Sequence, residues 1–247
     1  MIERELDDGI LTLRLAHGKA SAMDVELLEG LERELGDLAD ARAIVLTGTG
    51  SIFSAGVDLF RITEGGAAYV DRFLPLLSSF VRALFTVPVP VVAAVNGHAI
   101  AGGGVMTLGA DYRLMADGNG RIGVPELLVG VPFPASPLEV VRFAVSPERV
   151  QALIYTGRTL PPREALAQGL VDEVVDADAL LARAREVAAQ LAALPPEVFR
   201  LTKQALRAQA VARMDAAAEY DRAAHALWAA PETHARIREY VERTMRR

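Results

Sequence analysis

Two stretches of the chain contain glycines that would leave backbone N–H groups free to bind a ligand. In residues 88–111 an apolar run ends at Asn96-Gly97, and Ala101–Gly104 (AGGG) then precedes an apolar segment with helical character. The first N–H groups of a helix have no partner inside the helix and lie at its positive end. Such a turn can bind a phosphate or stabilise a forming oxyanion, whereas glycines needed only for close packing would give the same pattern.

The second stretch, residues 42–59, reads RAIVLTGTGSIFSAGVDL. Its apolar residues 44–46 predict a short buried strand, and residues 47–50 (TGTG) form a turn signal. The following segment FSAGVDL brings a further glycine into the backbone at Gly56. The sequence therefore predicts two glycine-hinged segments, each following an apolar strand.

Glu126 is a carboxylate within the largely apolar segment 121–134, where Val124, Leu127 and Leu128 are its neighbours. Removal from water raises the pKa of a carboxyl group toward neutrality. A group with such a pKa can both take up and release a proton near pH 7. The residues alone leave a second interpretation open, in which Glu126 points to solvent from a turn.

The pair of segments FSAGVDL and AVNGHAIAGGG resembles the crotonase (enoyl-CoA hydratase/isomerase) superfamily, and the resemblance continues through most of the chain. It implies an α/β fold, in which a spiral core of ββα units is followed by a helical C-terminal portion. It also implies that two backbone N–H groups, those of Val57 and Gly102, grip the thioester oxygen of an acyl-CoA. Glu126 falls on the position of the acid/base glutamate of the family.

The resemblance also implies where coenzyme A binds. Residues 17–24 resemble the family segment that folds around the adenine end of CoA, and Lys19 could meet the CoA phosphates or remain a solvated surface lysine. The residues that we expect to bind acyl-CoA are Lys19, Ala20, Ala22, Ala55, Gly56, Asp58 and Leu59. CoA is part of the substrate, so we expect no separate cofactor. The four histidines share no ligand spacing and the chain has no cysteine, so we expect no metal site.

Family hydratases carry a second glutamate on the helix after the glycines, and this position matches Val105 here. With one carboxylate at the site, we expect a 3-enoyl-CoA to 2-enoyl-CoA isomerase. An alternative is a hydratase in which Glu139, on a helix expected over residues 133–145, supplies the second acid. We favour a surface position for Glu139, paired with Arg142. A family member that binds acyl-CoA without catalysis is a further alternative.

The amino-acid composition and net charge limit the kinds of protein that this chain can be. The 247 residues are 51% hydrophobic and 23% charged, which is typical of a soluble globular protein. No apolar run is long enough to span a membrane, and no leader precedes the first strand, so we expect a cytoplasmic protein. The formal charge of −6 argues against a nucleic-acid partner.

Hydrophobic periodicity predicts the elements around these segments. We expect a hairpin that turns at Asp8-Gly9, an irregular stretch over residues 61–68 and an amphipathic helix over residues 69–85. Tyr69, Phe73 and Leu77 are candidates for a wall against the acyl chain, although a plain core face is favoured.

A change in composition near Val175 divides the chain. We expect an α/β core over residues 1–175 and a helical portion over residues 176–247. In the family this portion builds the contacts of the trimer and part of the acyl-CoA site. The resemblance therefore implies self-association as a homotrimer or hexamer.

Overall fold

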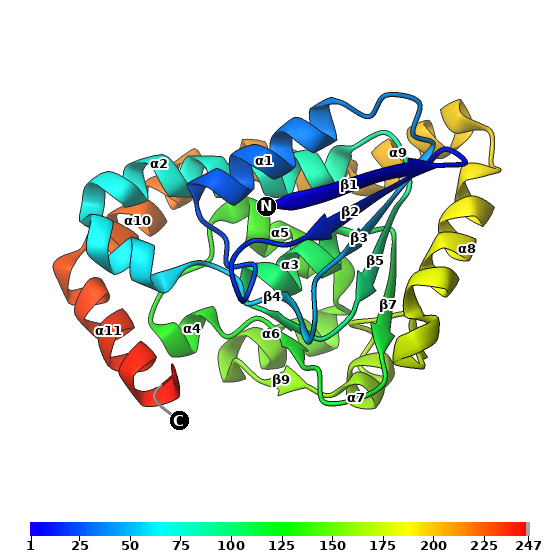
Figure 1. The fold of residues 1–247 in the computed structure, drawn as a ribbon. Helices are drawn as coiled ribbons and strands as arrows, with labels where there is room; N and C mark the ends of the chain where they lie inside the picture. Colours follow the sequence, from blue (N-terminus) through cyan, green and yellow to red (C-terminus); the bar gives the residue numbers. More distant parts are fainter. Residues whose placement is uncertain (246–247) are drawn as a thin grey trace.

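The computed structural model describes residues 1–245, which form two mainly parallel β-sheets with helices packed around them (Figure 1). The larger sheet has the strand order β1-β2-β3-β5-β7-β10. Its strands are β1 (Ile2–Asp7), β2 (Ile10–Leu15), β3 (Ala43–Thr47), β5 (Val91–Val95), β7 (Tyr112–Ala116) and β10 (Glu173–Val175). β1 and β2 form the expected antiparallel hairpin, and the other neighbours are parallel. The α/β fold expected from the sequence is confirmed.

The two faces of the larger sheet are covered by different helices. One face packs against helices α1 (Val25–Gly36), α2 (Leu59–Thr86) and α3 (Gly102–Gly109), and the other against helix α8 (Leu180–Ala192). Side chains alternate across a strand, so Ile44 and Leu46 of β3 join the main core, whereas Ala43 and Val45 face α8. Both faces are therefore buried, which explains why β3 and β5 read as continuous apolar runs in the sequence.

The smaller sheet carries the two glycine segments. Its order is β4-β6-β8-β9, with β4 (Ile52–Ser54), β6 (His98–Ile100), β8 (Ile122–Gly123) and β9 (Thr159–Leu160). β4 and β6 are parallel neighbours, so the segments that follow them leave the sheet at the same edge. Asn96 ties the preceding turns together: its Oδ1 accepts from the Gly48 amide at 2.8 Å, and its Nδ2 donates to the Gly50 carbonyl at 2.9 Å.

The first three helices begin next to the glycine segments or the N-terminal loop. α1 (Val25–Gly36) is capped by Asp24, α2 (Leu59–Thr86) by Asp58, and α3 (Gly102–Gly109) begins at the glycine run. The expectation of an irregular stretch over residues 61–68 is wrong, because Asp58 accepts from the amides of Phe60 and Arg61 and starts a helix there. Gly66, with φ of 62°, is the one non-helical position inside α2.

The remaining described helices follow the smaller sheet and β10. They are α4 (Glu126–Val129), α5 (Ala135–Ala144), α6 (Pro147–Thr156), α7 (Pro162–Ala167), α8 (Leu180–Ala192), α9 (Pro196–Asp215), α10 (Ala218–Ala229) and α11 (Pro231–Met245), with a 3₁₀ turn, η1 (Ala177–Ala179), before α8. The chain is helical after Val175, as the sequence indicates; the division into domains at residue 175 stays a prediction.

A buried ionic cluster fixes α9 to the core. Asp111, which follows α3, accepts from Lys203 at 2.6 Å and from Arg207 at 2.8 Å, and both cations belong to α9. Beyond α9 the chain turns back, and α10 and α11 pack against α2. This return brings α11 beside α4, as Figure 1 shows. Within residues 1–245 no helix combines the length and apolar character needed to cross a membrane.

Candidate active site

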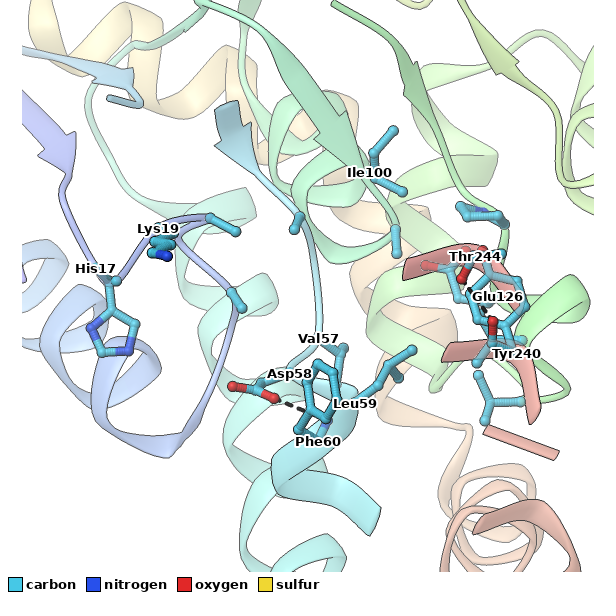
Figure 2. Close-up of a pocket in the computed structure, with 18 of the residues that line it drawn as sticks. His17, Lys19, Val57, Asp58, Leu59, Phe60, Ile100, Glu126, Tyr240 and Thr244 are labelled. Atoms are coloured by element: carbon cyan, nitrogen blue, oxygen red, sulfur yellow. Dashed lines mark hydrogen bonds between the residues drawn. The ribbon is translucent and has the colours of Figure 1, made fainter. Parts of the chain in front are cut away.

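A cavity of about 530 Å³ lies where the edge of the smaller sheet meets the C-terminal helices (Figure 2). Five parts of the chain contribute to it: the N-terminal loop, the segment after β4, the end of β6, α4 with its flanks, and helices α10 and α11. The lining residues are His17, Gly18, Lys19, Ala20, Ala22, Ala55, Val57, Asp58, Leu59, Phe60, Ile100, Ala101, Pro125, Glu126, Val129, Val131, Trp228, Tyr240 and Thr244.

The two glycine segments touch each other at the edge of this cavity. Gly56 has φ of 82°, and a Cβ atom there would lie 2.5 Å from the Ile100 carbonyl oxygen and 2.9 Å from the Gly102 nitrogen. Only glycine fits this position, both because of its backbone angle and because of the space. The contact brings the backbones at Val57 and Gly102 next to each other.

The N–H groups of Val57 and Gly102 at this contact are not directed at the backbone hydrogen bonds around them. Met23 bonds to the Gly56 carbonyl and to the Asp58 amide, so the Val57 N–H, which lies between them, points away from Met23. Gly102 is the first residue of α3, and its N–H precedes the first intrahelical bond, which Val105 donates to Ala101.

Ala101 connects β6 to α3 in a strained conformation, with φ of 52° and ψ of −121°. A non-glycine residue in this region costs about 1–3 kcal/mol and persists only where the surroundings impose it. The next two glycines serve packing, since a Cβ at Gly103 would lie 2.3 Å from the Ser54 carbonyl and one at Gly104 2.7 Å from that of Gly123. The packing interpretation of the glycine run therefore holds for Gly103 and Gly104, and the role of the Gly102 amide stays a prediction.

Glu126 begins α4 and lies across the cavity, beside Tyr240 of α11 (Figure 2). Its side chain is buried, and among the described residues its Oε2 atom has no hydrogen-bond partner. Burial raises the pKa of Glu126 to about 8, while a bond from its own backbone amide opposes the rise. The solvent-facing interpretation of Glu126 is wrong, and its carboxyl group has the properties of a proton carrier near neutral pH.

Most residues expected to bind acyl-CoA line the cavity: Lys19, Ala20, Ala22, Ala55, Asp58 and Leu59. Gly56 lies behind the wall and supports it through its contact with residues 100–102. The proposed wall residues Phe73 and Leu77 are core residues of α2, and Tyr69 accepts a bond from the Val25 amide. None of these three lines the cavity, so the core interpretation is confirmed.

Glu139 lies away from the cavity. It pairs with Arg142, as expected, but it is buried and not on the surface, because Arg213 of α9 also binds its carboxylate. The side chain of Val105, at the position of the second hydratase glutamate, is buried in the main core.

The resemblance implied that the helical C-terminal portion supplies part of the acyl-CoA site, but sequence reasoning named no residue of it. Trp228 of α10 lines the cavity and donates from its indole Nε1 to the Pro132 carbonyl at 2.8 Å. Tyr240 and Thr244 of α11 lie beside Glu126 (Figure 2). These residues are about a hundred positions from Glu126, and their helices read as ordinary amphipathic segments, so the sequence contained no local signal for them. In the described part of the chain, no group of three His, Cys, Asp or Glu side chains is placed to hold a metal ion.

Comparison with known proteins identifies the family. The family model described as enoyl-CoA hydratase/isomerase matches residues 5–245. The chain belongs to the enoyl-CoA hydratase/isomerase family.

The relatives of this chain include proteins named as enoyl-CoA hydratases and proteins named as enoyl-CoA isomerases. A putative enoyl-CoA hydratase of Thermus thermophilus is 38% identical over 188 residues, which are 74% of this chain and 72% of the relative. The mitochondrial enoyl-CoA delta isomerase 1 of Rattus norvegicus is 29% identical over 212 residues, 84% of this chain and 73% of the relative. The crystal structure of human mitochondrial delta3-delta2-enoyl-CoA isomerase superposes with a TM-score of 0.94 at 24% identity, covering 99% of this chain and 98% of that one, which shows the same fold.

The burial of Glu126 predicts a specific dependence of stability on pH. Unfolded Glu126 loses its proton near pH 4.5, whereas the folded protein holds it until about pH 8, so raising the pH through this range favours the unfolded state. Glu126→Gln removes this effect. Its free energy of unfolding relative to wild type should increase by up to roughly 1.4 kcal/mol per pH unit between these values. Urea unfolding over that pH range measures the difference; a difference independent of pH would contradict the burial of the carboxyl group.

Proposed function

We propose that the protein is an enoyl-CoA isomerase, which converts a 3-enoyl-CoA to the 2-enoyl-CoA with Glu126 as the single acid/base. The observation that carries the proposal is the buried carboxyl group of Glu126, which lines the same cavity as Val57 and lies across it from that residue (Figure 2). Gly102, the first residue of α3, lies behind Ala101 of the cavity wall, next to Gly56. Coenzyme A enters as part of the substrate, bound along Lys19 and the N-terminal loop.

The reaction needs one proton carrier. The Glu126 carboxylate takes a proton from C2 of the 3-enoyl thioester, and the electron pair of that C–H bond moves toward the thioester carbonyl and gives a dienolate. The protonated Glu126 then returns a proton to C4. The double bond now lies between C2 and C3, and the carboxylate is restored. No other reactant is consumed.

The dienolate carries its charge on the thioester oxygen, and the two amides are the proposed donors to it. Hydrogen bonds that strengthen as charge develops lower the barrier, and a well-placed donor contributes about 3 kcal/mol. Each amide belongs to a rigid element, one beside the bridge to Met23 and the other at the start of α3. Little reorganisation is then needed during the reaction.

The other carboxylates near the site are engaged elsewhere. Asp58 lines the cavity, but its Oδ1 accepts from the Phe60 and Arg61 amides as the cap of α2. Glu139 is held by two arginines outside the cavity. The hydratase alternative, which depends on Glu139 as the second acid, therefore lacks support from the site, although the relative from Thermus thermophilus is named a hydratase. The similarity to the rat isomerase agrees with the proposal.

We also propose that the protein self-associates and that it is located in the cytoplasm. Val198, Leu201 and Leu206 of α9 are each more than half exposed, and an apolar face of this kind supports the homotrimer or hexamer expected from the resemblance. The absence of cysteine from the sequence agrees with the cytoplasmic location proposed here.

Glu126→Gln should lower the rate of isomerisation of a 3-enoyl-CoA by at least a factor of about 100, because the variant keeps the shape of the side chain and removes the proton carrier. Affinity for a saturated acyl-CoA should persist. In the wild type, kcat/KM should rise with pH to a plateau above about 8, where the Glu126 carboxylate forms.

The matched control is Glu139→Gln, which removes a buried carboxylate outside the cavity. It should isomerise at a rate within a few-fold of wild type once folding is verified by circular dichroism. Robust hydration of 2-enoyl-CoA by wild type that disappears in Glu139→Gln would replace the isomerase proposal with the hydratase alternative.

The oxyanion role of Gly102 can be tested with a pair of variants. Gly102→Pro removes the N–H at the first position of α3, where helices tolerate proline. Gly102→Ala keeps the N–H and adds the same Cβ, which would lie 2.6 Å from Sδ of the buried Met23, so the Met23 side chain must shift in both variants. We expect turnover to fall by about 100-fold or more in the proline variant relative to the alanine variant. Equal activities in two folded variants would remove Gly102 from the proposed oxyanion hole.

A further inference from the structure

We propose that Trp228 and Tyr240 close the acyl end of the cavity, so that the site selects acyl-CoA thioesters with short and medium chains over those with long chains. This inference rests on the proposed function, because it assumes that the cavity holds an acyl-CoA. It concerns α10 and α11, in which the sequence indicated no individual site residue.

The cavity has two different ends. His17 and Lys19 lie on one side of it, Val57 lies in the middle, and Glu126, Tyr240 and Thr244 lie on the other side (Figure 2). A thioester oxygen at the Val57 amide places the charged CoA moiety toward Lys19. The acyl chain must then extend past Glu126 toward α10 and α11.

The wall at the acyl end is apolar and has protein behind it. Val129 is 6% exposed, and Val131 and Trp228 are each 2% exposed, although all three face the cavity. Since these residues are tightly packed on nearly all sides, a chain cannot pass between them to the outside. The acyl end is therefore a floor, and Thr244, which is exposed, lies nearer the opening.

Trp228 is held in place from two directions. Its indole Nε1 donates to the Pro132 carbonyl, and its own carbonyl accepts from Nε2 of His234 on α11, each at 2.8 Å. Tyr240 packs against the main core from α11 and is partly buried. A fixed indole makes a stop that cannot move aside at low cost, because its hydrogen bonds would break.

This arrangement predicts how affinity depends on chain length. A methylene buried against the apolar floor strengthens binding about fourfold. Once the chain reaches Trp228, further carbons gain nothing and must fold back toward the opening. A cavity of about 530 Å³ suits one ligand of moderate size, and it must also hold the thioester end of CoA. Long chains such as palmitoyl therefore exceed it.

Trp228 is the single tryptophan of the chain, so its fluorescence reports the acyl end directly. Wild-type protein is titrated with free CoA and with saturated acyl-CoAs from acetyl to palmitoyl, and affinity is measured in parallel by calorimetry. We expect an emission change that is absent with CoA and appears as the chain lengthens, with affinity ceasing to rise at the same length. Binding of acyl-CoAs with unchanged emission, or affinity that rises through palmitoyl, would overturn the inference. Failure of every acyl-CoA to bind would instead reject the proposed function.

Two variants test whether Trp228 and Tyr240 limit the length of the acyl chain. Trp228→Leu and Tyr240→Leu should each move the optimal length to longer chains, with at least a fourfold gain for the first methylene beyond the wild-type optimum. Tyr240 is partly buried, so its variant remains informative if Trp228→Leu fails to fold. The control is Tyr220→Leu, since Tyr220 also lies on α10 but bonds to the Phe133 carbonyl outside the cavity. An unchanged optimum in Tyr240→Leu, or the same shift in the Tyr220 control, would contradict the assignment.

Discussion

The close contact between Gly56 and the backbone of residues 100–102 is the constraint on which the site depends. It requires a residue without a side chain at position 56, a positive φ there and a strained Ala101. The parallel pairing of β4 with β6 and the bonds of Asn96 impose that geometry from behind. The strain at Ala101 is thus maintained by the pairing of two strands and by a turn that does not line the cavity.

The second constraint is the exclusion of water from Glu126. Glu126 is buried and shares the cavity wall with the core residues Val129 and Val131, and α11 packs over α4. Burial lowers the stability of the folded protein at high pH, because it opposes ionisation. The same burial gives the group a pKa at which it can accept and return a proton, so stability and activity make opposite demands on this residue.

Local patterns in the sequence were sufficient for much of this arrangement. The segments FSAGVDL and AVNGHAIAGGG indicated the two amides, and Glu126 stood out as a carboxylate in an apolar run. No local sequence pattern indicated which residues from distant parts of the chain would contact one another. Trp228 and Tyr240 reach the cavity only because α9, fixed by Asp111, lets α10 and α11 turn back onto α2. Glu139 was expected on the surface because its pairing with Arg142 is visible in sequence, whereas its partner Arg213 on α9 is not.

The most direct test of the account follows the protons of the substrate. The protein is incubated with a 3-enoyl-CoA in heavy water for a prolonged period, and the products are analysed by NMR and mass spectrometry. One buried carboxyl group that serves both carbons predicts the 2-enoyl-CoA as the main product, with deuterium accumulating at both the α- and the γ-carbon. A 3-hydroxyacyl-CoA as the main product, or deuterium at the α-carbon alone without movement of the double bond, would contradict it.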